Sequence, residues 1–246
     1  MTGKVWTRRG ALGAITALAL ASCGPQVTTA ADSSNPPSYK YRLTATVETP
    51  QGERSGHSVI AVWWRSPSPI FGTQGSAGFT VKGEAVAVDL PKGQTLFVLL
   101  RSAANVDWAA YAHESVPVPM QQGAKLADWM QAIARDHGIY PINRRRETVV
   151  EDSDNYPYFV RFRDIADPKS VEQVDPDDLA KSFGAGYRLK SLTVQMTDEA
   201  LTAGIGKRLG WLSRIRGPLD GQNLMYPDGQ LSNRITSGDF RQGKNQ

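Results

Sequence analysis

The sequence predicts an α+β fold in which antiparallel β-hairpins dominate and a few helices pack on them. The 15 prolines and 23 glycines among 246 residues indicate many turns, which is typical of a hairpin-rich protein. Apolar and polar residues alternate in several segments, whereas only one segment has a strong helical period. A hydrophobic content of 40%, with 9% aromatic residues, is sufficient for the core of one domain of ordinary size.

The first strands are the clearest elements. Residues 39–48 alternate apolar and polar side chains, which predicts a half-buried strand. The turn sequence TPQGER leads into residues 55–64, and the two segments together predict a hairpin. Further strands are predicted at residues 79–90 and 95–101, joined by a tight Pro-Lys-Gly turn. The run TLFVLL is apolar throughout, so we expect a central strand that is covered on both faces.

One helix has a complete apolar stripe. Residues 124–137 carry apolar side chains at positions i, i+3, i+4 and i+7, which predicts an amphipathic helix that Gly138 ends. We expect the stripe to face the core. Two more strands are predicted after it, at residues 157–163 and 188–196.

Two shorter helices are expected nearer the C-terminus. The first has Asp175 as its N-cap and ends near Gly184. The second covers residues 197–208, because acidic residues stand in its first turn and basic residues in its last. The final stretch, residues 213–246, is polar and glycine-rich, and we expect a docked segment within it at 234–240.

The N-terminus has the composition of an export signal. Lys4, Arg8 and Arg9 precede a run of small and apolar residues at 11–21. This run is shorter than the roughly 20 residues that a helix needs to cross a bilayer. We therefore expect residues 1–22 to be a signal peptide. The arginine pair also resembles a twin-arginine export signal, so the general secretory and twin-arginine routes both stay open.

The residues Leu20, Ala21, Ser22 and Cys23 resemble the lipobox of bacterial lipoproteins, in which an aliphatic and two small residues precede cysteine. The resemblance implies that the Cys23 sulfur receives a diacylglyceryl group and that cleavage leaves Cys23 at an acylated N-terminus, with palmitate among the expected acyl chains. Several acyl chains hold a protein stably at a membrane, whereas a single chain binds only marginally. Gly24, in place of Asp, implies passage to the outer membrane, with the protein facing the periplasm. The alternative is a free thiol in a plain secreted protein.

The rest of the chain is expected to form a tether and one domain. Residues 23–38 are polar and contain a Pro-Pro pair without any apolar period, which predicts a flexible tether. Residues 39–246 then form a single periplasmic α+β domain with a polar C-terminal extension.

Charge and cysteine content exclude several functional classes. The leader contributes three of the formal net charge of +4, so the remainder is nearly neutral and we expect no nucleic-acid partner. A single cysteine allows neither an intramolecular disulfide nor a cysteine-based metal site. Residues 204–208 read Gly-Ile-Gly-Lys-Arg but lack the Ser or Thr that a P-loop uses for magnesium. We predict no cofactor, no metal and no catalytic residue.

The one dense basic run, Arg144, Arg145 and Arg146, supplies the candidate binding residues. Such a run suits anionic headgroups or another anionic polymer of the cell envelope. The simpler interpretation is a solvated basic turn beside the acidic residues at 151–154.

No sequence motif pairs a histidine with a nucleophilic serine. No Gly-x-Ser-x-Gly elbow accompanies them. His137 is expected in the last turn of its helix, where it would bind free carbonyl groups. His57 lies in a predicted strand beside Ser58, which points to the opposite face.

Residues 159–212 resemble a group of uncharacterised proteobacterial proteins. They carry the pattern F-x-D-x-x-D-P-x-S-V-x-x-V-D-P, followed by Phe-Gly, T-D and K-R-L-x-W-L. The segments SGHSVIAV and GEAVAVDL resemble the front half of the same group, so the likeness covers most of residues 41–240. No activity is known for this group, so the resemblance implies no catalytic residue in this chain.

Two functional hypotheses follow. The preferred one is a membrane-anchored, non-enzymatic envelope module that binds a protein or glycan partner. The alternative is a periplasmic hydrolase that uses dispersed carboxylates and one histidine.

Overall fold

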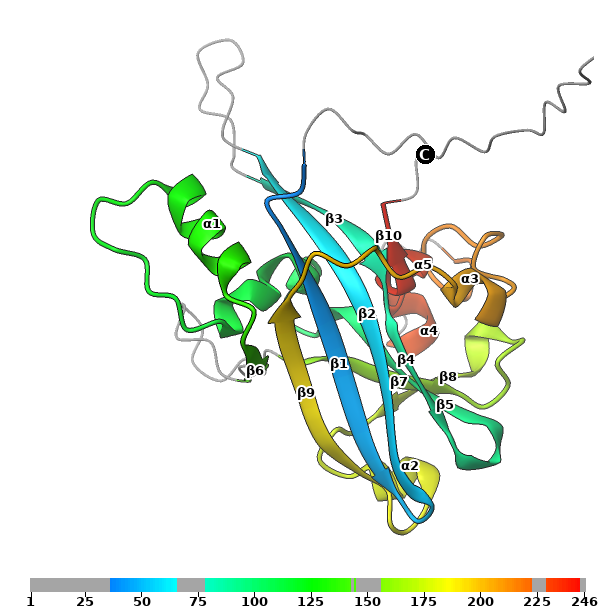
Figure 1. The fold of residues 1–246 in the computed structure, drawn as a ribbon. Helices are drawn as coiled ribbons and strands as arrows, with labels where there is room; N and C mark the ends of the chain where they lie inside the picture. The colour runs from blue at the N-terminus through cyan, green and yellow to red at the C-terminus, as the bar shows by residue number, and fades with distance from the viewer. Residues whose placement is uncertain (1–35, 66–77, 143, 145–155, 223–228, 244–246) are drawn as a thin grey trace, which may run out of the picture. The chain divides into compact units, whose positions relative to one another are not determined.

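Two antiparallel sheets and several helices form the body of the molecule, which confirms the predicted α+β class (Figure 1). The computed structural model describes residues 36–65, 78–142, 144, 156–222 and 229–243. Cys23, Arg145 and Arg146 lie outside these residues, as do the predicted signal peptide and nearly all of the predicted tether.

The larger sheet has the strand order β10-β3-β2-β1-β9-β6. Its strands are β1 (Tyr39–Thr49), β2 (Gly52–Arg65), β3 (Gly78–Glu84), β6 (Ile139–Pro141), β9 (Arg188–Met196) and β10 (Arg241–Gln242). The smaller sheet has the order β4-β5-β7-β8. Its strands are β4 (Val86–Leu90), β5 (Gln94–Ser102), β7 (Pro157–Phe162) and β8 (Val171–Val174).

The helices are short, apart from one. They are α1 (Leu126–Arg135), α2 (Leu179–Phe183), α3 (Ile205–Arg208), α4 (Leu231–Arg234) and α5 (Ser237–Phe240), with 3₁₀ helices η1 (Pro91–Gly93), η2 (Trp108–Ser115) and η3 (Pro168–Ser170). None of the helices in the described residues is long and apolar enough to cross a bilayer.

The β1–β2 hairpin confirms the first strand prediction. Pairing runs without interruption from Tyr39 opposite Val62 to Thr49 opposite Gly52. Along β1 every second side chain is buried, and the side chains between them are half-exposed. This alternation is the one that residues 39–48 predicted, because successive side chains of a strand point to opposite faces.

Residues 79–90 form two strands of different sheets rather than one strand. β3 ends at Glu84 and pairs with β2, whereas β4 begins at Val86 and pairs with β5. Between them, the Ala85 N–H donates to the Phe240 carbonyl at 2.8 Å. This bond with a distant part of the chain accompanies the change of sheet, and no local sequence pattern reports it.

Two hydrophobic cores lie on the two faces of the smaller sheet. On β5, Leu96, Val98 and Leu100 belong to the core shared with β1, β2 and β9. Phe97 and Leu99 face the other way, into a core completed by residues 205–240. β5 has β4 and β7 as neighbours, so the prediction of a central strand covered on both faces is confirmed.

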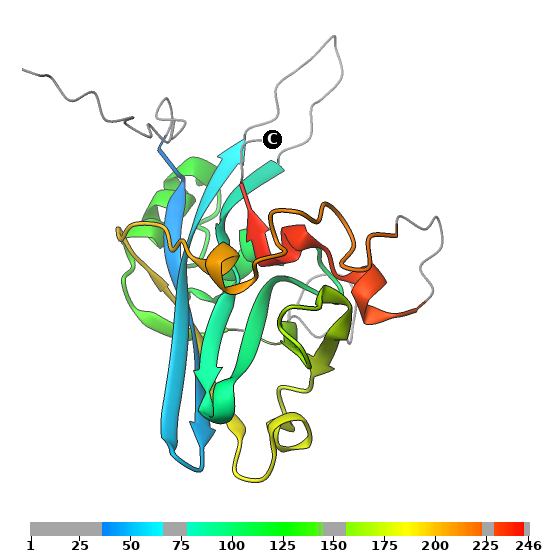
Figure 2. The same ribbon diagram turned by 90° about the vertical axis from the view of Figure 1, so that its right-hand side faces the viewer.

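The C-terminal part of the chain covers the second core. Figure 2 shows α3, α4 and α5, in orange to red, on one side of the β4–β5 hairpin. Ile235 and Phe240 are fully buried, which confirms the expected docked segment at 234–240. Phe240 contacts Phe97, Phe162 and Trp211 ring to ring. The segment therefore forms part of the packed body, although its composition is polar.

α1 confirms the predicted amphipathic helix but is shorter than residues 124–137. Met130 and Ile133 are buried against the first core. The helix ends at Arg135, and the Asp136 carboxylate accepts a hydrogen bond from the Gly138 N–H at 2.9 Å. His137 is consequently outside the helix, so its placement in the last turn was wrong.

α2 begins later than predicted. Asp178, not Asp175, is the N-cap, and its side chain accepts from the Lys181 N–H at 3.2 Å. Asp175 instead accepts from the Asp177 N–H at 2.9 Å, which forms a turn ahead of the helix. Both aspartates suit a cap, and the local sequence alone does not separate them.

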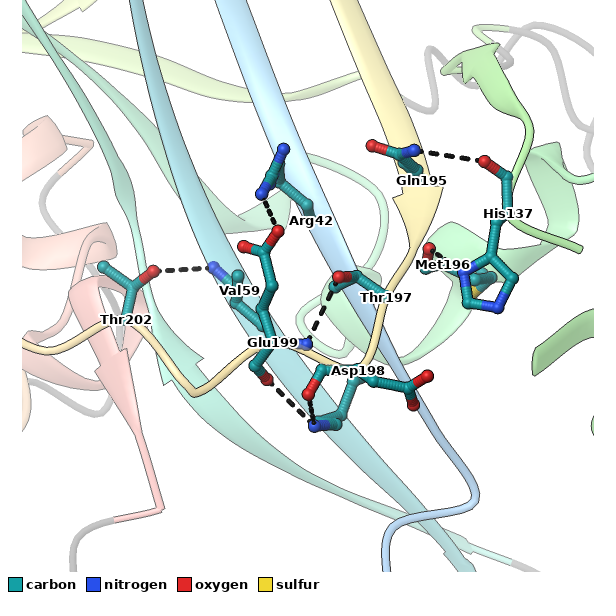
Figure 3. A network of polar contacts seen from close by, with 10 residues as sticks. Arg42, Val59, His137, Gln195, Met196, Thr197, Asp198, Glu199 and Thr202 are labelled. Carbon is teal, nitrogen blue, oxygen red and sulfur yellow. Dashed lines mark hydrogen bonds and ion pairs between the residues drawn. The ribbon is translucent and has the colours of Figure 1, made fainter. Parts of the chain in front are cut away.

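The helix predicted over residues 197–208 is wrong for its first eight residues. Residues 197–204, named the strap here, form no regular secondary structure, and only α3 is helical. Figure 3 shows the strap crossing β1 and β2. Lys40 Nζ donates to the Asp198 and Glu199 carbonyls at 2.6 and 2.9 Å, so tertiary partners bind carbonyl groups that a helix would use internally.

Candidate binding groove

The described residues form a groove of about 760 Å³ between β3, β10 and the chain around residues 212–217 and 236–238. It is lined by Thr80, Val81, Leu212, Ser213, Ile215, Arg216, Gly217, Thr236, Ser237, Gly238, Arg241, Gln242 and Gly243. The lining combines aliphatic side chains, hydroxyl groups and two arginines. Its volume is in the range of ligand-binding pockets.

One side of the groove is a strand edge that no other described strand covers beyond β10. β10 pairs with β3 only at Glu84 and Gly83. Gly243 follows with a left-handed φ of 78° and still lies against β3, since a Cβ atom at this position would be 3.0 Å from Lys82 Cα. Within the described part of the chain, residues 78–82 of β3 have β2 as their only strand neighbour.

The hydrogen bonds of the sheet show which backbone groups face this edge. Ala85 donates towards Phe240, so the backbone groups of alternate residues, Gly83, Val81 and Phe79, point to the same side, away from β2. The pairing of β2 agrees with this assignment. The Val62 carbonyl accepts from the Ser38 N–H on the β1 side, so the backbone groups of Val62 do not point to its partner Val81 on β3. Val81 and Phe79 therefore present backbone N–H and carbonyl groups towards the groove side of β3.

The charge of the groove is positive. Arg216 is exposed, and Arg241 has a side chain that is 16% exposed. Arg241 Nη1 lies 3.9 Å from Glu84 Oε1, while Glu84 Oε2 accepts from the Ile205 N–H at 2.8 Å. No acidic residue is among the described residues that line the groove. A concave surface lined by one sign of charge concentrates ligands of the opposite sign.

A buried polar network holds the wall at residues 236–238. Thr236 and Asp239 form a capping box at the start of α5, and the Thr236 N–H donates to Asp239 Oδ2 at 2.7 Å. Arg101 Nη1 lies 3.6 Å from the same carboxylate oxygen. Burial raises the pKa of Asp239 above 3.8, and the hydrogen bonds from Thr236 and the charge of Arg101 oppose this rise.

The predicted basic run is only partly described, and the described part lies away from the groove. Arg144 Nη1 is 2.7 Å from Asp177 Oδ1, and its guanidinium lies 4.9 Å from the centre of the Tyr156 ring. These contacts occupy Arg144 in a structural role between the loop before β7 and the turn before α2. Arg145 and Arg146 lie outside the described residues, so the binding prediction for them stays a prediction.

His113 and His57 occupy different environments. His113 is buried beside Tyr39, with 2.8 Å between Nδ1 and the tyrosine hydroxyl, and Phe79, Tyr111 and Trp129 lie around its ring. His57 is exposed and Ser58 is buried, which confirms that they point to opposite faces. In the described ranges no three His, Cys, Asp or Glu side chains gather into a possible metal site.

A second polar arrangement fastens the strap to the larger sheet (Figure 3). Arg42 pairs with Glu199, and this contact lowers the pKa of Glu199 through a hydrogen bond from the guanidinium. The Val59 N–H donates to the Thr202 hydroxyl at 2.9 Å, and the Thr202 N–H donates to the Val59 carbonyl at 3.3 Å. Nearby, His137 Nδ1 is 3.0 Å from the Met196 carbonyl oxygen.

Thr202 supplies strand-like bonds to β2 just beyond the pairing with β3, which ends at Ala61 opposite Lys82. It occupies both backbone groups of Val59 on that side, in the place where another strand would bind. The strap thus covers the β2 edge at Val59, whereas no described strand covers residues 78–82 of β3 at the groove.

No protein-family model, no curated protein and no solved structure matches the chain. The sequence did not indicate Arg216, Arg241 or the β3 edge as a site, because they meet only when residues 205–243 dock on the smaller sheet. The one local signal was Gly243, a residue that can leave an extended strand.

Proposed function

We propose that the protein is a lipid-anchored envelope protein whose domain binds a protein or glycan partner. The groove between β3, β10 and residues 212–217 is the observation that supports binding. It is large enough for a ligand, and it is lined by arginines, hydroxyls and aliphatic groups. One of its sides is a strand edge that lacks a second neighbour among the described residues.

In this proposal Cys23 carries the lipid, and the protein is attached to the outer membrane and faces the periplasm. The lipobox residues before Cys23 support the anchor. The test is fractionation of cells that produce either the wild-type chain or Cys23→Ala. We expect the wild type to stay in the membrane fraction until detergent releases it. We expect Cys23→Ala to be extracted without detergent. Unchanged attachment of Cys23→Ala would contradict the anchor.

Binding at the groove is tested by affinity capture from detergent-solubilised cells. The baits are the wild-type chain, Arg216→Glu in the groove and Arg135→Glu on α1. Both arginines are exposed, so the two charge reversals are matched. We expect a partner that the wild type and Arg135→Glu retain and that Arg216→Glu loses. Equal retention by all three baits would contradict a binding site in the groove.

The hydrolase alternative has less support from the described residues. A hydrolase of the predicted kind needs carboxylates close to a histidine in one pocket. His113 lies among aromatic rings, and neither histidine nor carboxylate side chains line the groove in the described part of the chain. The alternative therefore stays a prediction, to be examined by turnover of a hydrolase substrate panel.

A further inference from the structure

We propose that the groove binds an extended peptide with acidic side chains, which adds a strand to the open edge of β3 in line with β10. This inference deepens the proposed function, since it rests on the groove being the binding site. It names the chemical class of the partner segment and the way it is held.

The backbone of β3 supplies the first reason. Phe79 and Val81 direct their N–H and carbonyl groups to the side that β10 leaves uncovered in the described part of the chain. Residues 78–82 extend over about 16 Å at the usual rise of a strand, which is enough for a short peptide strand. A peptide in extended form offers complementary N–H and carbonyl groups at the same spacing.

The side chains around the edge supply the second reason. A bound strand would point its side chains alternately to opposite faces. Val81, Leu212 and Ile215 provide aliphatic contact for an apolar set. Arg216 is exposed and provides positive charge for an acidic set, and no carboxylate is among the described lining residues. Arg241 adds charge that the nearby Glu84 carboxylate partly neutralises.

The charge also favours an acidic peptide over a second copy of this chain. Lys82 continues the positive charge along β3 beside the two arginines, so two such edges would bring like charges together. An acidic peptide neutralises the same groups. A small anion alone would use the arginines but would leave the strand edge and the aliphatic residues without a partner.

The test is a fluorescence anisotropy titration of the full chain in detergent micelles. The probe is a fluorescein-labelled peptide of about seven residues in which valine and glutamate alternate. Two matched peptides serve as controls. One has the same sequence with alternate backbone nitrogens methylated, which prevents strand addition, and the other has lysine in place of glutamate.

We expect the valine–glutamate peptide to bind and both control peptides to bind at least about tenfold more weakly. Arg216→Glu should weaken binding of the valine–glutamate peptide by about fivefold or more, whereas Arg135→Glu should leave it unchanged. Hydrogen exchange provides an independent measurement on the folded chain. Bound peptide should slow exchange of the Phe79 and Val81 amides and leave the β1 amides unaffected.

Several results would overturn the inference. One is equal binding of the N-methylated peptide, and another is the absence of binding or of amide protection. A third is concentration-dependent dimerisation that protects the same amides without peptide, because a second copy would then occupy the edge. If a groove-dependent partner is nevertheless captured in cells, only this inference fails. If no partner depends on Arg216, the proposed function fails as well.

Discussion

Gly56 lies where β2 passes closest to β4. A Cβ atom at this position would be 2.1 Å from the Ala87 carbonyl oxygen and 2.8 Å from the Ala87 carbonyl carbon. Both atoms belong to the backbone, so no side-chain rotation can relieve the contact. A glycine in a strand can mark such a close approach of another backbone segment.

Gly56→Ala should therefore lower the free energy of unfolding by about 3 kcal/mol, at or above the upper end of ordinary overpacking costs. Urea denaturation followed by tryptophan fluorescence measures this change. Ser55→Ala is the control, because Ser55 is exposed and should change stability by less than about 0.5 kcal/mol. A neutral Gly56→Ala would show that β2 and β4 do not approach this closely.

Asp239 makes the free energy of unfolding depend on pH. Its pKa is raised in the fold, so the folded state binds the proton more tightly than the unfolded state. The resulting stabilisation is fully present below the ordinary carboxyl pKa of 3.8 and is lost as pH rises through the raised value.

Asp239→Asn removes this titration. We expect the wild type to be more stable relative to Asp239→Asn at about pH 4 than at about pH 7, as measured by urea midpoints at both values. The opposite trend would mean that Arg101 and the Thr236 N–H lower the pKa of Asp239 more than burial raises it.

At the scale of the element, local patterns predicted the strands well and the strap badly. Residues 39–48 alternate over their full length, and burial on one face follows directly from that alternation. β9 alternates in the same way from Leu192 to Met196, after a register shift in its pairing with β1. The strap has charges arranged as in a helix, but Gly204 and Gly206 weaken helix formation. Its carbonyl groups bind Lys40, and Thr202 binds Val59, so contacts distant in sequence decide its conformation.

Thr202→Val tests the closure of the β2 edge by the strap. The substitution removes the hydroxyl that accepts from the Val59 N–H and leaves a buried donor without that partner. We expect a loss of about 1–2 kcal/mol in the free energy of unfolding and faster hydrogen exchange at the Val59 amide. Thr202→Ser keeps the hydroxyl and should retain most of the protection. Equal exchange in both variants would contradict the role given to the hydroxyl.

At the scale of the molecule, the sequence predicted the class of fold but not the groove. The alternation and the TLFVLL run are local and identify strands and a central position. The groove depends on the Ala85 N–H donating to the Phe240 carbonyl and on the capping box that starts α5. Ala85 and Phe240 are more than 100 residues apart in sequence, and Arg144, the described member of the predicted basic run, contributes nothing to the lining.

We propose that a lipid-anchored domain offers this groove to a partner in the cell envelope. Site-specific photo-crosslinking in living cells tests it most directly, with the photoreactive residue placed at Thr80 in the groove or at Ser55 on β2 outside it. Both positions are exposed. We predict a discrete crosslinked product in the membrane fraction from Thr80, its loss on adding Arg216→Glu, and no such product from Ser55. The same product from both positions, or none from Thr80, would contradict the account.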